Sequence, residues 1–370
     1  TDDLVFSANS RDSSKKIAEL CIYYGDPAAR GKLLYFENPQ DCPSLTRLLL
    51  DDPAYGVDTS YLYSDIADMA YPWGFGDLCT GDFNADTFPD IAVVAYRNWY
   101  APEVAIIYGG ADFRGTTRAM SIPGDLISTK VLCESMRYLD LAYDSYPGWY
   151  PYQGPFVRLA CGDLNGDGID DLVVGDRTVD PDGVDVDAPW SYFIDLPWNP
   201  SDLGKPISGT GATYIVYGSR DLPSAVINLA TPTAESGETI IRGEGFPNHF
   251  GLSLAVGDVN QDGYDELAVG GMSHWQWVEN RGAFIYLFPG SKTKLGNPWG
   301  NGSLVALNAG FAPIGVWGET RIAYQALYWI PYGLGIEYGD VTGDGRADFM
   351  YASNRTTDWF LVAARSQLQV

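Results

Sequence analysis

The feature that most constrains the fold of this chain is an acidic loop that recurs four times in phase. Each copy follows a Gly-Asp pair, alternates Asp or Asn with other residues, and leads directly into an apolar run. The four copies span Gly81–Asp90, Gly162–Asp171, Gly257–Glu266 and Gly339–Asp348. A loop repeated in this way predicts one supersecondary unit used several times.

Apolar, β-branched and aromatic runs accompany each loop, and their composition favours strands over helices. The runs that follow the loops are Ile91–Ala95, Leu172–Gly175, Leu267–Gly270 and Phe349–Ala352, with Asp3–Ala8 as a fifth copy that has no loop before it. A second recurring run comprises Leu20–Gly25, Ala105–Gly109, Tyr214–Gly218, Phe284–Gly290 and Trp359–Ala364. We expect a fourth strand of each unit near Ser121–Ile122, Ala225–Leu229 and Leu304–Leu307.

The repeat has the strand content of propeller blades, since four strands recur about every 80 to 95 residues. The sequence therefore predicts an all-β chain, a β-propeller or repeat array of about five four-stranded units in one domain, 1–370. The approximate units are 1–70, 71–153, 154–247, 248–330 and 331–370. The first lacks the first strand and its loop, and the last lacks the fourth strand.

The loops are predicted to bind calcium, which takes six to eight oxygen ligands. Counting the Asp of each Gly-Asp pair as position 1, side chains at positions 1, 3, 5 and 9 and the backbone carbonyl of position 7 supply oxygens. The predicted ligands are Asp82, Asn84, Asp86, Phe88 and Asp90; Asp163, Asn165, Asp167, Ile169 and Asp171; Asp258, Asn260, Asp262, Tyr264 and Glu266; Asp340, Thr342, Asp344, Arg346 and Asp348. We expect about four structural Ca²⁺ ions as the cofactors.

The first loop differs from the others at position 6, where it has Thr87 and the others have glycine. Glycine there permits a sharp turn of the backbone. The first loop is predicted to be the weakest site. An EF-hand would need Glu at position 12, where the four loops have Val93, Val174, Val269 and Tyr351. The competing explanation, that Asp, Asn and Gly only build hairpin turns, fits one isolated loop better than four loops in phase.

The balance of charge limits the partners, since 48 acidic residues against 23 basic ones give a formal charge of -25. Such a chain is not expected to bind nucleic acid or an anionic membrane. No apolar run is long enough to insert into a bilayer, and Thr1 begins without a basic and apolar leader, so any signal peptide or anchor would lie outside this sequence.

The five cysteines show no C-x-x-C spacing, which argues against a zinc or thioredoxin-type site, whereas one or two disulfides with an odd thiol left over are compatible with the sequence. The five are Cys21, Cys42, Cys79, Cys133 and Cys161. The sequons at Asn301 and Asn354 permit glycosylation of a secreted chain.

Together, these motifs resemble FG-GAP repeats of the kind that build the integrin α-subunit propeller. The resemblance is carried by Phe75-Gly76, Phe250-Gly251 and Tyr332-Gly333 before the loops, and by the D-x-N-x-D-G-x-x-D pattern within them. The Gly-Ala-Pro element is absent as such. The resemblance implies a calcium-stabilised propeller that is extracellular or on the cell surface, with ligand-binding loops on the face opposite the calcium loops.

Aromatic residues concentrate in the connections expected on that opposite face, and exposed aromatic clusters are typical of protein interfaces and of platforms for sugar rings. The predicted ligand-binding residues are Trp99, Tyr100, Trp149, Tyr150, Trp190, Trp198, Trp275, Trp277 and Trp329. The alternative is that these rings fill gaps between units.

The sequence favours a non-catalytic adhesion or ligand-binding protein that recognises a protein or a glycan. One alternative is a structural subunit of an extracellular fibre that assembles head to tail into a homo-oligomer or filament, because the two ends overlap in their strands. The other is a calcium-dependent enzyme active on polysaccharides or lipids. The chain has two histidines, His249 and His274, and no Gly-x-Ser-x-Gly motif, which disfavours catalysis.

Overall fold

The fold is all-β over the part of the chain that the structure, a computed structural model, describes. The described residues are 4–9, 18–24, 45–50, 75–97, 101–111, 113, 117–120, 127–132, 157–176, 211–222, 226–229, 239–242, 250–273, 282–292, 304–306, 313–314, 335–343, 345, 347–352 and 359–362. These residues contain no helix, and hence no helix with the length and apolarity needed to cross a membrane.

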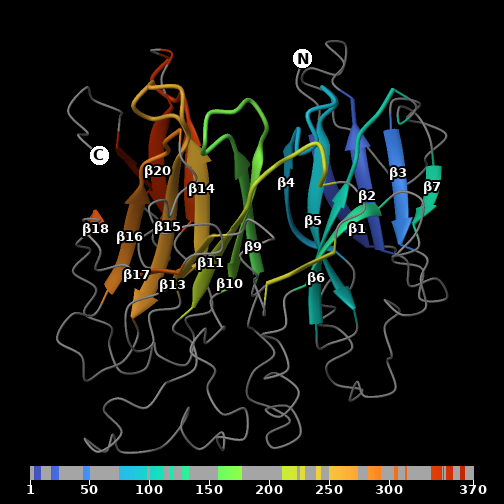
Figure 1. Ribbon diagram of the computed structural model, residues 1–370, viewed down its shortest axis with the longest axis horizontal. Coiled ribbons are helices and arrows are strands. Elements are labelled where there is room, and N and C mark those ends of the chain that lie inside the picture. The colour runs from blue at the N-terminus through green and yellow to red at the C-terminus, as the bar shows by residue number, and fades with distance from the viewer. Residues whose placement is uncertain are drawn as a thin grey trace, which may run out of the picture.

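Five sheets follow one another along the chain (Figure 1). The first has the order β1-β2-β3-β7, with β1 Leu4–Asn9, β2 Ala18–Tyr23, β3 Leu45–Leu50 and β7 Thr117–Met120. The second has the order β12-β8-β6-β5-β4, with β4 Phe75–Gly81, β5 Asp90–Arg97, β6 Ala101–Ile107, β8 Ile127–Leu132 and β12 Val226–Asn228.

The third sheet has the order β17-β13-β11-β10-β9, with β9 Val157–Gly162, β10 Asp171–Asp176, β11 Ala212–Val216, β13 Thr239–Arg242 and β17 Leu304–Ala306. The fourth has the order β14-β15-β16-β18, with β14 Ser253–Gly257, β15 Glu266–Ser273, β16 Gly282–Phe288 and β18 Pro313–Ile314. The fifth comprises β19 Gly335–Gly339, β20 Asp348–Ala352 and β21 Trp359–Val362. The strands predicted after the loops and the second recurring strands are confirmed.

The outer strands differ from the prediction, because the second, third and fourth units each contribute a strand to the sheet that precedes them. The fourth position of the second, third and fourth sheets is taken by β8, β13 and β18. The segments that we expected there, near or within β7, β12 and β17, instead pair in parallel with the sheet that precedes their own. The second and third sheets therefore have five strands, not four.

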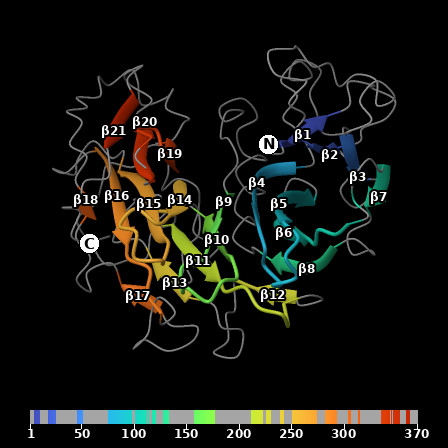
Figure 2. The same cartoon turned by 90° about the horizontal axis from the view of Figure 1, so that it is seen from above.

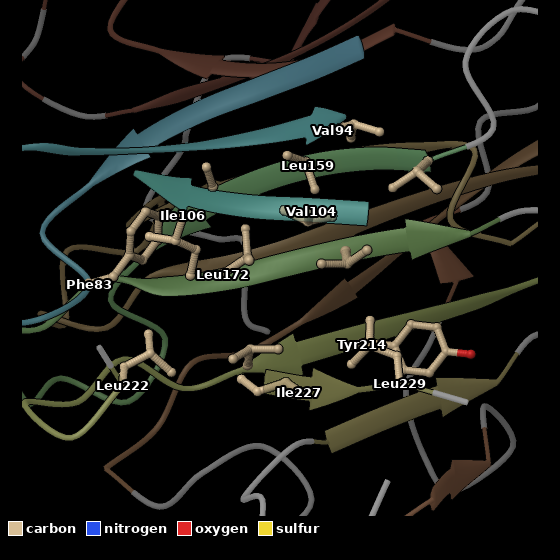
Figure 3. Close-up of a cluster of buried hydrophobic side chains, with 14 of the residues drawn as sticks. Phe83, Val94, Val104, Ile106, Leu159, Leu172, Tyr214, Leu222, Ile227 and Leu229 are labelled. Atoms are coloured by element: carbon tan, nitrogen blue, oxygen red, sulfur yellow. The ribbon is translucent and has the colours of Figure 1, made fainter. Parts of the chain in front are cut away.

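The second strands of the three middle sheets, β5, β10 and β15, have consecutive apolar residues because sheets pack on both of their faces. In β5, Ile91 and Val93 face a core shared with the first sheet, whereas Ala92 and Val94 face one shared with the third. Figure 3 shows the latter core, where the ring of Phe83 lies among side chains of the second and third sheets. Two further cores join the third sheet to the fourth and the fourth to the fifth.

The sheets lie along an arc, with β4, β9, β14 and β19 on its inner side and β7, β12, β17 and β18 on its outer rim (Figure 2). A carboxylate of the second sheet influences the pKa of a carboxylate of the fifth sheet. Burial raises the pKa of Glu337 on β19, and the carboxylate of Asp77 on β4 adds to that increase.

A disulfide links the inner strands of the second and third sheets. It joins Cys79 of β4 to Cys161 of β9, with a Cα–Cα distance of 6.0 Å. One of the disulfides that the sequence left possible is thus present, while Cys42 and Cys133 lie outside the described residues. This covalent bond adds to the side-chain packing and the hydrogen bonds that join the two sheets, such as the N–H of Leu159 on β9 donating to Asp77 Oδ2 on β4 at 3.0 Å.

Candidate cation-binding loops

The acidic loops connect the inner strand of a sheet to its second strand, and their side-chain oxygens hold the loop backbone in a tight turn. In the loop between β9 and β10, Asp163 accepts the N–H of Asp167 on Oδ1 at 3.1 Å and that of Gly168 on Oδ2 at 2.8 Å. Asn165 Oδ1 accepts the N–H of Asp167, and Asp167 Oδ1 accepts that of Ile169, both at 2.9 Å. These successive Asx-type bonds explain why the loop requires short oxygen-bearing side chains at alternate positions.

The same bonds recur in the loops of the second and fourth sheets. Position 1 accepts the N–H groups of positions 5 and 6, position 3 that of position 5, and position 5 that of position 7. In the fifth sheet, Asp340 accepts the N–H of Gly343 at 2.6 Å and of Gly345 at 2.8 Å. Asp344 and Arg346 lie outside the described residues.

Position 6 has the same left-handed backbone in all four loops. The φ angles are 82° at Gly168, 89° at Gly263 and 85° at Gly345. Thr87 adopts a φ of 74°, so the first loop keeps this geometry without glycine. A left-handed conformation costs a non-glycine residue roughly 1–2 kcal/mol.

Replacing Thr87 with glycine is therefore expected to stabilise the protein by about 0.5–1 kcal/mol, because relief of this strain exceeds the added entropy of the unfolded chain. The change is measured as a higher midpoint of denaturant unfolding. Gly168→Thr is the matched control and should lower the midpoint. An unchanged or lower midpoint for Thr87→Gly would contradict the strain at this position.

The acidic residue at position 9 is buried and ties the loop to the rest of its sheet. Asp171 accepts the N–H of Leu164 on Oδ2 at 3.1 Å and that of Gly218, just after β11, on Oδ1 at 3.0 Å. Asp90 repeats both bonds with Phe83 and Gly109. Glu266 and Asp348 are also fully buried and accept the N–H of position 2.

Burial of these groups disfavours their charged form. Desolvation raises the pKa of Asp171 to about 8, of Glu266 to about 7 and of Asp90 to about 6. Repulsion from the carboxylates at positions 1 and 5 of the same loop adds to each increase. Each loop thus gathers more negative charge than its surroundings compensate, and a cation would relieve this excess.

The donor set suits a hard divalent cation, since every side chain at positions 1, 3, 5 and 9 in the described parts of the loops carries an oxygen atom. As the described loops stand, no three carboxylates, cysteines or histidines converge on a common point. The hydrogen bonds above account for this, because oxygens at positions 1, 5 and 9 accept backbone N–H groups. An oxygen that accepts one N–H keeps a second lone pair that an ion can use, whereas Asp163 Oδ1 and Asp348 Oδ2 each accept two N–H groups.

The predicted recognition surface and glycosylation sites remain predictions. Trp99, Tyr100, Trp149, Tyr150, Trp190, Trp198, Trp275, Trp277 and Trp329 all lie outside the described residues. So do Asn301 and Asn354.

Two carboxylates at position 8, Asp170 and Asp265, were not among the predicted site residues. Each contacts the acidic loop of the preceding sheet. The signal available in the sequence was an aspartate placed directly before the acidic residue of position 9 in two of the four loops.

Comparison with known proteins supports the repeat assignment. The FG-GAP repeat model matches residues 250–273, which include β14, β15 and the loop between them, so the chain contains an FG-GAP repeat. A search of curated protein sequences found no match.

Among solved structures, the chain is similar to the exotype rhamnogalacturonan lyase YesX, with 11% identity and a TM-score of 0.36. The similarity covers 93% of this chain and 48% of the lyase chain, so this chain spans about half the length of that structure.

Proposed function

We propose that this chain, which carries an FG-GAP repeat, is a non-catalytic extracellular binding protein built as a calcium-stabilised β-propeller. The observation that carries the proposal is the bonding pattern shared by the loops after β4, β9 and β14. Three loops, in three different sheets, direct side-chain oxygens at alternate positions into the same turn. Turn formation alone does not require the buried acidic residue that ends each loop.

In this proposal, the oxygens at positions 1, 3, 5 and 9 and the carbonyl of position 7 hold the ion in each loop. Bound calcium supplies positive charge that offsets the buried carboxylates. The chain's own residues hold the loop in its turn before the ion arrives, which reduces the ordering cost of binding. We assign the ions a structural role.

The propeller assignment is supported by the four successive cores and by the inner position of β4, β9, β14 and β19 (Figure 2). Strands that pack around a common axis in this way are typical of propeller blades. Closure of the arc into a ring is part of the proposal.

Recognition of a protein or glycan is proposed for the aromatic-rich connections opposite the acidic loops. An extracellular location is supported by the disulfide between Cys79 and Cys161, because such bonds persist in oxidising compartments. Binding to a glycan array and to a panel of matrix proteins tests this assignment, with Trp275→Ala and Trp329→Ala as the first variants. Retention of all binding by both variants would count against the aromatic face.

Head-to-tail assembly is the second candidate, favoured by exposed apolar side chains on the two end sheets. Leu4 on β1 is 54% exposed, and Val341, in the acidic loop between β19 and β20, is 55% exposed. Val341 occupies loop position 2, where Phe83, Leu164 and Val259 are buried in the other sheets. Small-angle scattering separates the candidates, since a closed ring is monomeric whereas a filament grows with concentration.

Calcium titration of the full chain tests the metal-binding part of the proposal. We expect about four ions per chain, and the loss of one ion when Asp163 and Asp167 are both replaced by alanine. Asp221→Ala is the matched control, because Asp221 is exposed and lies outside the loops. A wild-type chain that binds no calcium would refute the proposal.

A further inference from the structure

The aspartate at position 8 of an acidic loop forms hydrogen bonds with the acidic loop of the preceding sheet. Asp170 Oδ2 accepts the N–H of Asp82, in the preceding sheet, at 2.7 Å, and the N–H of Asp170 donates to the carbonyl of Asp82 at 3.1 Å. Asp265 makes the same pair of bonds with Asp163, at 2.8 Å and 3.0 Å. In both cases, position 8 of one loop holds the backbone of position 1 of the loop before it.

The glycine of the Gly-Asp pair leaves space for this aspartate side chain. A Cβ on Gly81 would lie 2.8 Å from both the Cβ and Oδ2 of Asp170. A Cβ on Gly162 would collide in the same way with Oδ2 of Asp265. The glycine that opens these two loops is thus matched to an aspartate in the next unit along the chain.

Further contacts join the same pairs of loops. The N–H of Ser219, which follows β11, donates to the carbonyl of Phe83 at 3.0 Å, and that of Ser291, which follows β16, donates to the carbonyl of Leu164 at 3.0 Å. The ring of Tyr264 lies against the Cα of Gly166, where a Cβ would collide with it. Each loop is therefore held by contacts from the following sheet as well as by its own bonds.

We infer that Asp170 and Asp265 are positioning residues that make the cation affinity of one loop depend on the next sheet. The inference rests on the proposed function. Asp82 and Asp163 supply the first ligand of their loops, and the hydrogen bonds from position 8 of the next loop fix the backbone that carries them. Without it, the start of the loop must be ordered when the ion binds, which weakens binding.

The loop between β14 and β15 provides an internal comparison. The following loop has Ala347 at position 8, which cannot make the side-chain bond. The contact there is instead Gln261 Nε2 donating to the carbonyl of Gly345 at 2.9 Å. The affinity of this loop is accordingly not set by an aspartate of the fifth sheet.

Calcium titration by calorimetry on the full chain tests the inference. Asp170→Ala is expected to weaken one site about tenfold, the scale of losing a hydrogen bond to a charged acceptor, and to leave the others unchanged. Asp170→Asn should restore most of the affinity, because its amide oxygen can accept the same N–H. Asp265→Ala should weaken calcium binding by the loop of Asp163 to the same extent. This variant replaces Asp170→Ala in the test if Asp170→Ala does not fold.

A double-variant cycle identifies which loop is affected. When the loop of Asp82 is disabled by Asp86→Ala, Asp170→Ala should change the remaining sites less than twofold. If its tenfold effect persists in that background, Asp170 acts on its own loop and the inference is wrong. The inference is also wrong if Asp170→Ala binds calcium as tightly as the wild type. A wild type that binds no calcium would instead contradict the proposed function itself.

Discussion

Excess chelator is expected to lower the melting temperature of this protein strongly. If free calcium exceeds each dissociation constant about tenfold, each ion stabilises the fold by about 1.4 kcal/mol, and four independent sites by on the order of 5 to 6 kcal/mol. For a chain of 370 residues that unfolds as one unit, this corresponds to a fall of roughly 7 °C. The physical reason is that chelation leaves the buried carboxylates of positions 9 without a compensating charge.

Circular dichroism melts in calcium and in chelator measure the effect. Excess calcium added back should restore the original melt, and magnesium should restore it less well, because magnesium prefers a tighter octahedral site. A melt that is the same in calcium and in excess chelator would remove the stabilising role of the ions.

Removal of the disulfide is the second change with a large expected effect. Cys79 and Cys161 are 82 residues apart, and the chain-entropy model gives about 4–5 kcal/mol for a cross-link of that span. The double variant Cys79→Ala with Cys161→Ala should therefore melt roughly 6 °C lower than the wild type. The bond connects the inner strands of two sheets, which stay joined without it by hydrogen bonds such as that from the N–H of Asp82 to Asp170.

A reducing agent provides the control for this variant. It should lower the melting temperature of the wild type to that of the double variant and leave the double variant unchanged. An equal fall in both proteins would mean that the reductant acts elsewhere, and that the bond between β4 and β9 contributes little.

The strands and loops were predictable from the sequence because each combines two signals. The Gly-Asp pair marks the loop, and an apolar run such as Leu172–Gly175 marks the strand after it. These runs are continuous because sheets cover both faces, and the loop residues are short because their oxygens accept nearby N–H groups. Local chemistry of this kind is visible in a single sequence.

The partners of the outer strands were not predictable. β12 and β17 are each three residues long, and nothing in so short a segment shows which sheet it joins. The pairing of Cys79 with Cys161 likewise depends on how neighbouring sheets face each other. The aspartates at position 8 were missed for a similar reason, since their contacts cross between units.

The strands that later units contribute to the preceding sheets constrain the order in which the protein folds during synthesis. The first sheet is completed by β7, which leaves the ribosome only after β4, β5 and β6 of the second sheet have been made. The second sheet waits in the same way for β12, and the third for β17. Each of these three sheets therefore keeps an open outer edge until part of the next sheet has emerged, so its folding lags its own translation by about one unit.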